Sequence, residues 1–174
     1  NMLPPDNFQE TPLPAIAHRT SPTNIGLYLL STVAARDFGW VGTLEALERL
    51  EACFSTLKRL DRFNGHFFNW YDTRDLRTLA PPYVSSVDSG NLAGHLIALA
   101  NACEEWAEVP PAEDGQGFAD TLALARMALA DMPGNSGAGL TALLEEVETL
   151  AGGPQSVEAA TPALTRLLDK ALKL

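Results

Sequence analysis

The chain has 174 residues, of which 46% are apolar and 20% are charged, so it can fold around a hydrophobic core of its own. Its formal net charge of −10 argues against nucleic-acid binding, because acidic surfaces repel phosphate backbones. No apolar stretch approaches the roughly 20 residues of a membrane span, and residues 1–10 lack the pattern of a signal peptide.

Residues 1–20 contain four prolines, which have no N–H group and hold the preceding residue in extended geometry. This composition predicts an extended arm that lies over a surface of the protein. The arm also has apolar residues that we expect to anchor it: Leu3, Phe8, Leu13 and Ile16.

Two helices are predicted next. Ser21 is a suitable N-cap and Pro22 suits the first helical position, so a helix should run from there to about Arg36. Its residues are apolar on nearly every side, which is typical of a buried helix. The second helix, 43–61, should be capped by Thr43 and has one apolar stripe. Together they predict a helical hairpin with one buried helix and one half-exposed helix.

Residues 66–84 have no helical period and end in two consecutive prolines, so we predict a short extended segment there. A third long helix should follow and run to about residue 108, with Asp88 or Ser89 as its cap. Gly90 and Gly94 near its start permit the close approach of another backbone or a ligand.

The composition changes after residue 108. The stretch VPPAEDGQG is typical of a linker, and three shorter helices rich in alanine and leucine are predicted to follow it. Residues 101–174 carry four basic and twelve acidic residues. We therefore predict an all-α protein in which residues 1–108 form the main segment and residues 109–174 form an acidic helical segment packed on it, the two making one structural unit.

The stretch HFFNWYDTRD (66–75) concentrates aromatic, amide, acidic and basic side chains in one loop. Sugar rings stack on aromatic side chains and their hydroxyl groups bond to Asp, Asn and Arg, and ligand sites combine such groups. We therefore interpret Asn69, Trp70 and Asp72 as a candidate site, whereas the phenylalanines suit a helical core. Asp72 and Asp88 could pair in glycoside chemistry, but a helix cap or a salt bridge explains Asp88 better. No metal-ligand spacing, phosphate loop or nucleophile triad is found, so no cofactor is predicted.

Three stretches, LPPDNFQE (3–10), AHRTSPTNIGLYLLS (17–31) and residues 65–103, resemble the cyclic β-1,2-glucan synthetases. The resemblance implies a fragment of a large inner-membrane enzyme, from the start of its glucoamylase-like region, with this region soluble on the cytoplasmic side. It implies helical hairpins that form part of an (α/α) barrel or toroid, in the region that cyclises a linear β-1,2-glucan by transglycosylation. The implied partners are the glucan chain and other regions of the parent protein. The catalytic carboxylates are not identified, and the residues expected near the sugar cleft are Arg19, Asn24, Tyr28, Asn69, Trp70, Tyr71, Asp72, Asp88 and Asn91.

A second interpretation stays open from the sequence. The polar cluster could instead belong to a non-catalytic helical module that docks neighbouring domains and makes no sugar contact. Because an incomplete barrel leaves apolar helix surface uncovered, we also expect that the isolated fragment can form homo-oligomers.

Overall fold

The computed structural model describes residues 1–108, 116–132, 138–151 and 165–166. The described residues form two compact units, the first comprising residues 1–37 and 41–108, and the second residues 38–40 together with the described residues beyond 115. The described residues are mostly helical, as the sequence predicts, and they also contain three pairs of very short strands. The predicted third C-terminal helix lies outside the described residues apart from positions 165–166.

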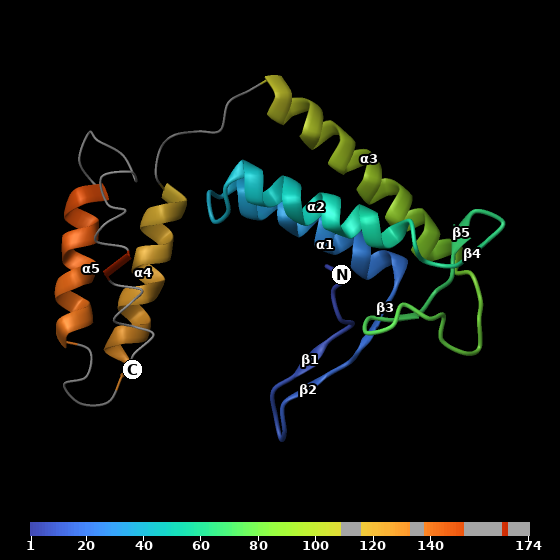
Figure 1. Ribbon diagram of the computed structural model, residues 1–174, viewed down its shortest axis with the longest axis horizontal. Helices are drawn as coiled ribbons and strands as arrows, with labels where there is room; N and C mark the ends of the chain where they lie inside the picture. The colour runs from blue at the N-terminus through green and yellow to red at the C-terminus, as the bar shows by residue number, and fades with distance from the viewer. Residues whose placement is uncertain (109–115, 133–137, 152–164, 167–174) are drawn as a thin grey trace. The chain divides into compact units, whose positions relative to one another are not determined.

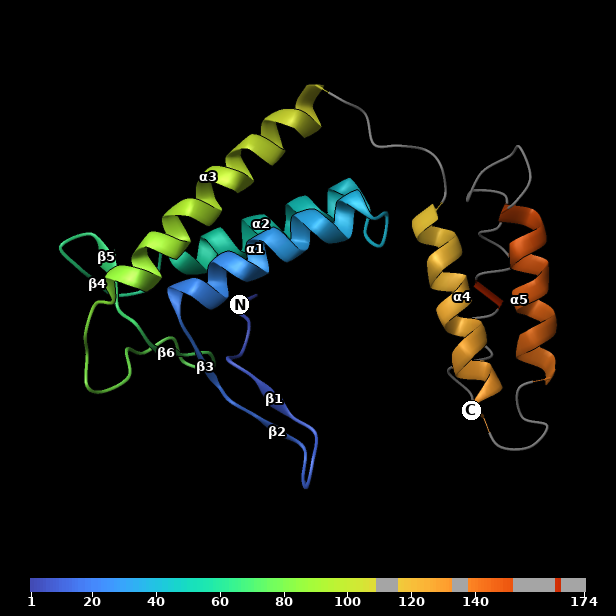
Figure 2. The same ribbon diagram turned by 180° about the vertical axis from the view of Figure 1, so that it is seen from behind.

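The first unit is built around three helices, α1 (Pro22–Asp37), α2 (Thr43–Leu57) and α3 (Ser86–Glu108). Helix α1 packs against both α2 and α3, and all three are seen together in Figures 1 and 2. The buried apolar residues of this core are Leu3, Ile25, Leu29, Leu50, Cys53, Leu57, Leu60, Tyr71 and Leu99. The predicted hairpin of α1 and α2 is therefore present, with α3 packed on α1.

Each short sheet has two antiparallel strands. Strand β1 (Phe8–Gln9) pairs with β2 (Ala15–Ile16), and β4 (Arg62–Phe63) pairs with β5 (His66–Phe67). Strand β3 (Arg19–Thr20) pairs with β6 (Tyr71–Asp72), so the arm before α1 lies beside the loop that precedes α3. The extended segment predicted near 66–84 is confirmed by β5 and β6.

The N-terminal arm differs from its prediction. It folds into the β1–β2 hairpin, which extends away from the helices (Figures 1 and 2). Leu3 is buried as expected, but Phe8, Leu13 and Ile16 are exposed. A two-stranded hairpin that stands away from the core has no surface on which to bury these side chains, so they do not anchor the arm in this chain.

The helix ends test the predicted caps. Ser21 caps α1 as predicted, since its Oγ accepts a hydrogen bond from the Asn24 N–H at 3.2 Å. The cap predicted for α2 is wrong: Gly42 is the N-cap, and the Thr43 hydroxyl accepts a hydrogen bond from Arg36 instead. Helix α3 is capped by Ser85, whose Oγ accepts from the Asp88 N–H at 3.1 Å, so neither Asp88 nor Ser89 is the cap.

Two further expectations need correction. The second helix ends at Leu57 and not at residue 61; Asn64 and Gly65, which follow it, both have positive φ angles and form the two-residue turn between β4 and β5, for which Asn-Gly is the favoured sequence. Helix α1 is not buried on every side, because Leu27 is exposed.

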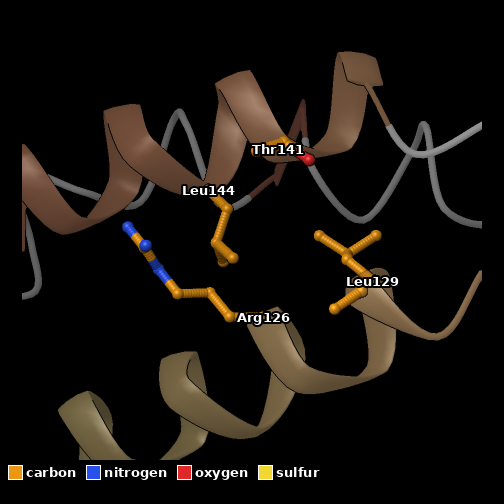
Figure 3. Close-up of a pocket in the computed structure, with 5 residues that line it drawn as sticks. Arg126, Leu129, Thr141 and Leu144 are labelled. Atoms are coloured by element: carbon orange, nitrogen blue, oxygen red, sulfur yellow. The ribbon is translucent and has the colours of Figure 1, made fainter. Parts of the chain in front are cut away.

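The second unit contains α4 (Gln116–Ala130) and α5 (Ala138–Ala151), which pack against each other. Leu122, Leu144 and Val147 form its buried core, and Arg126 forms an ion pair with Glu148. A cavity of about 230 Å³ lies between the helices, with Arg126 and Leu129 facing Leu144 and Thr141 across it (Figure 3). The two helices therefore share a small core of their own.

Candidate functional site

The pairing of β3 with β6 brings two distant parts of the sequence together at the beginning of α1. Arg19 lies opposite Asp72 and Thr20 lies opposite Tyr71. The loop is held further by a hydrogen bond from the Thr73 N–H to the His18 carbonyl oxygen, at 3.2 Å. The aromatic cluster of residues 66–75 is therefore fixed against the N-terminal end of α1.

Tyr71 belongs to the core and not to a surface site. Its side chain is 0% exposed, and its hydroxyl group donates to the Asp61 carbonyl at 2.6 Å and accepts from the Phe68 N–H at 2.7 Å. Burial raises the pKa of the Tyr71 hydroxyl to about 12. No part of this side chain is open to a ligand in the described structure, so we remove Tyr71 from the candidate site.

The carboxylate of Asp72 also forms its hydrogen bonds within its own loop. Asp72 is 3% exposed, and its carboxylate accepts hydrogen bonds from the Arg74 N–H at 2.9 Å and from the Arg74 guanidinium at 3.0 and 2.6 Å. These side-chain and backbone hydrogen bonds from Arg74, opposed by desolvation, hold the pKa of Asp72 well below its usual range. Its negative charge is fixed by the neighbouring arginine and stabilises the loop.

Asn69 joins the loop to α3. It is 4% exposed, and the hydrogen-bonding partners around its amide assign the nitrogen as a donor to Asp88 Oδ2 at 2.8 Å. In that orientation its oxygen accepts from Trp70 Nε1 at 2.8 Å and from the Tyr83 hydroxyl at 2.7 Å. One buried amide therefore holds two aromatic side chains and one carboxylate in place.

Asp88 joins α3 to α1. Its Oδ1 accepts from the Thr23 hydroxyl at 2.7 Å, and the same hydroxyl oxygen accepts from Asn91 Nδ2 at 3.1 Å. Desolvation raises the pKa of Asp88, but hydrogen bonds from Ser85, Thr23 and Ser21 together outweigh it and leave the pKa below its usual value. Asp88 is therefore ionised at neutral pH and ties the first turns of the two helices together.

Arg19 connects Trp70 of the loop with Asp6 of the N-terminal arm. Its guanidinium lies 4.7 Å from the centre of the Trp70 ring and bonds to Asp6 at 3.0 and 2.8 Å. Asp6 also accepts from Asn24 Nδ2 at 3.1 Å. The hydrogen bond from Asn24 is the largest influence on Asp6; with Arg19 it outweighs desolvation and lowers the Asp6 pKa.

Six of the nine predicted residues thus lie in one connected set of contacts, which we call the helix-end network. Its members from the prediction are Arg19, Asn24, Asn69, Trp70, Asp88 and Asn91. Trp70 is half-buried and Asn91 is exposed, whereas Asn69 is enclosed. Tyr28 lies apart from this network, where it lines a cavity of about 260 Å³ with other residues of α1, with Arg49 of α2 and with Val41 between the two helices.

The prediction missed three members of the network, Asp6, Thr23 and Tyr83. Thr23 lies two residues after the predicted cap Ser21 and directly before Asn24, so the sequence did indicate a position near the site. Asp6 and Tyr83 lie in proline-rich stretches whose local pattern does not indicate which elements they contact. Their roles depend on the β3–β6 pairing, which no local signal specifies.

Among the described residues, no three of the His, Cys, Asp and Glu side chains gather as metal ligands would. None of the helices there has the length and apolar character needed to cross a bilayer.

The chain is similar in sequence to a known enzyme. The cyclic β-(1,2)-glucan synthase NdvB of Rhizobium meliloti is 56% identical to this chain over 136 residues. That match covers 76% of this chain and 5% of the synthase, so the chain spans only a small part of the relative's length. No family model matches the chain. The similarity confirms the resemblance read from the sequence.

Proposed function

Because this chain matches a short segment of a cyclic β-(1,2)-glucan synthase, we propose that it is a part of such an enzyme and contributes to the wall of its sugar cleft. In this proposal the hairpin of α1 and α2, with α3, is a portion of an (α/α) toroid. The helix-end network faces the cleft in the region that closes a linear β-1,2-glucan into a ring. The identity of 56% supports the parent enzyme, and the chemistry of the network supports the cleft.

The observation that carries the proposal is the contact of Arg19 with Trp70, which the network links through Asn69, Asp88 and Thr23 to Asn91 near the start of α3. Trp70 is half-buried and offers an apolar ring, the Arg19 side chain is 51% exposed, and Asn91 is exposed. An indole with a guanidinium beside it, and an amide in the same network, can hold a pyranose through stacking and hydrogen bonds to its hydroxyl groups. Asn69 and Asp88 fix the ring and the helix ends from behind.

The carboxylates of the network, and that of Asp72 beside it, suit binding better than proton transfer. A general acid in glycoside chemistry needs a raised pKa, so that it is protonated at neutral pH. The pKa values of Asp6, Asp72 and Asp88 are all lowered. We therefore place the catalytic acid of the transglycosylation elsewhere in the parent enzyme and give these three residues positioning roles.

A structural role is the second candidate function, and one observation favours it. Asn69, Tyr71 and Asp72 are enclosed, and their polar atoms bond within the chain. A loop of this kind can hold a helical module together, or present it to neighbouring domains, without touching a sugar. The two candidates differ in what the loss of the Trp70 ring would do.

The test uses the intact synthase that contains this segment, with Trp70→Ala and the control Phe63→Ala. Phe63 is an exposed aromatic residue on β4, outside the helix-end network. If Trp70 contacts the glucan, Trp70→Ala raises the KM for linear β-1,2-glucan at least tenfold in cyclisation assays, with little change in melting temperature. A lowered melting temperature with an unchanged KM would instead establish the structural role. Phe63→Ala should leave both quantities unchanged.

A further inference from the structure

The outward-facing side of α3 has no charged residue over most of its length. Between Asp88 and Glu104 the helix contains no Asp, Glu, Lys or Arg. Val87 is 69% exposed and Ile97 is 66% exposed. We define the outer face of α3 by its exposed residues Val87, Gly90, Ala93, Gly94, Ile97 and Asn101. A helix surface that meets water usually carries charged or polar side chains, so this face has the composition of a contact surface.

Helix α2 shows what a solvated face looks like in the same unit. Its exposed side carries Glu45, Glu48 and Glu51 among the apolar residues Leu44, Leu47 and Phe54. Both helices contribute to one core, and both present a side that the described residues leave open. The difference between them is therefore not a general property of this chain's helices.

The glycines of α3 provide a second, independent observation. Among the described residues, nothing lies within 4 Å of the position that a Cβ atom would take at Gly90 or at Gly94. Gly26 on α1 differs, because a Cβ there would stand 2.2 Å from His95 Nδ1 and glycine is what lets α1 approach α3. Glycine is a poor helix former, so two of them one turn apart on an open face indicate a close approach by something that the described residues do not include.

We propose that the outer face of α3 is the docking site for another α-helix of the synthase polypeptide, which crosses α3 at Gly90 and Gly94. The inference rests on the proposed function in one respect, that the chain is part of a longer synthase. The matched segment is 5% of the relative's length, so most of such a polypeptide is available to supply this helix. The docking helix has small or apolar residues at the crossing and a basic residue opposite the exposed Glu104 and Glu108.

Charge also argues against the chain's own C-terminal part as the occupant. Residues 109–174 carry nine acidic and four basic residues, the same sign as Glu104 and Glu108 at the end of the outer face. A second copy of the chain would bring the acidic ends together if it packed in parallel, and in antiparallel packing it would place them beside the start of α3, which carries Asp88 and no basic residue. A helix from another part of the synthase need not be acidic, so neither charge argument applies to it.

Cysteine accessibility tests the proposal. Ile97→Cys, in a Cys103→Ser background, is labelled with a maleimide in this chain alone and in the intact synthase, and each position is followed by peptide mass spectrometry. The control is Glu48→Cys on the charged side of α2. We expect Ile97→Cys to react at least tenfold more slowly in the synthase than in the chain alone, while Glu48→Cys reacts at similar rates in both. Gly94→Leu in the synthase should restore rapid labelling, because a large side chain displaces the docked helix.

Three outcomes would overturn the proposal. Equal labelling of Ile97→Cys in the two proteins means that nothing covers the face. Protection in the chain alone that depends on its concentration assigns the face to a second copy, and protection that does not depend on concentration assigns it to residues 109–174. None of these measurements uses glucan, so a Trp70→Ala enzyme with an unchanged KM would end the cleft proposal and leave the docking face standing.

The melting temperature of the chain alone provides a second test that does not depend on labelling. In the chain alone, Gly94→Ala should raise the melting temperature, because alanine favours the helix and no neighbour lies close. Gly26→Ala should lower it, because the new methyl group meets His95. A lower melting temperature for Gly94→Ala would show that the chain itself already covers the face, contrary to the proposal.

Discussion

Tyr71 and Trp70 are neighbours in one loop, and the structure uses them in opposite ways. Tyr71 is wholly buried, and both hydrogen-bonding functions of its hydroxyl group are taken by backbone atoms of the same loop. Trp70 is half-buried, and its ring is met by Arg19 from the N-terminal arm. The comparison teaches that composition indicates the chemistry available to a cluster, whereas burial decides which members hold the fold and which remain open to a ligand.

The largest effect is expected where the loop joins the core. Tyr71→Ala should lower the free energy of unfolding by about 3–5 kcal/mol, because it leaves a cavity and removes two hydrogen bonds. Urea unfolding of the chain, followed by circular dichroism, measures this change. A loss of less than about 1 kcal/mol would mean that Tyr71 is not a core residue.

Tyr71→Phe separates the ring from the hydroxyl group. It keeps the packing but leaves the Phe68 N–H and the Asp61 carbonyl without this partner, so a loss of about 1–3 kcal/mol is expected. A matched change at an exposed aromatic residue, Phe63→Ala, should cost less than about 0.5 kcal/mol.

Asp72 should make the stability of the chain depend on pH. The pKa of Asp72 is lowered in the folded chain, chiefly by the hydrogen bonds from Arg74, so the folded state favours the ionised carboxylate. This stabilisation is present above the unfolded pKa of about 4 and is lost as the pH falls through the folded pKa. Asp72→Asn should therefore weaken the fall in melting temperature between about pH 5 and pH 2.

Asp6 and Asp88 also have lowered pKa values, so some dependence on pH should remain in the Asp72→Asn chain. Arg77→Gln is the matched control, since its guanidinium is 3.9 Å from Asp72 and Arg74 provides the closer contacts. A pH profile of Asp72→Asn that matched the unchanged chain would contradict the assignment of this carboxylate.

The sequence predicts the helices well because their signals are local. The Ser21-Pro22 pair marks the beginning of α1, and the apolar stripe of residues 44–60 matches a helix with Leu50 and Leu57 in the core. The predicted cap of α3 was three or four residues too late, because several Ser and Asp residues near its start satisfy the same preference, and the predicted cap of α2 was one residue too late, because glycine also suits a cap position.

The site was predictable in its composition and less so in its geometry. Arg19, Asn24, Asn69, Trp70, Asp88 and Asn91 do come together, although the sequence separates Arg19 from Asn91 by 72 positions. The enclosure of Tyr71 was not predictable, because it depends on the β3–β6 pairing and on packing against α2. An aromatic residue beside polar residues has the same local pattern whether it faces solvent or the core.

The smallest expected effect is a difference in coupling free energy between two cation–π contacts. Arg19 lies over Trp70 at 4.7 Å with its side chain 51% exposed, whereas Arg36 lies over Trp106 at 4.8 Å with its side chain 9% exposed. Double-mutant cycles with Arg→Met and Trp→Ala should give a coupling of about 0.5–1 kcal/mol for the exposed pair and about 2 kcal/mol for the enclosed pair, because water weakens the attraction of a cation for a ring. Equal couplings would show that Arg19 is as shielded from water as Arg36, and would leave the Trp70 ring less accessible to a sugar than the cleft proposal requires.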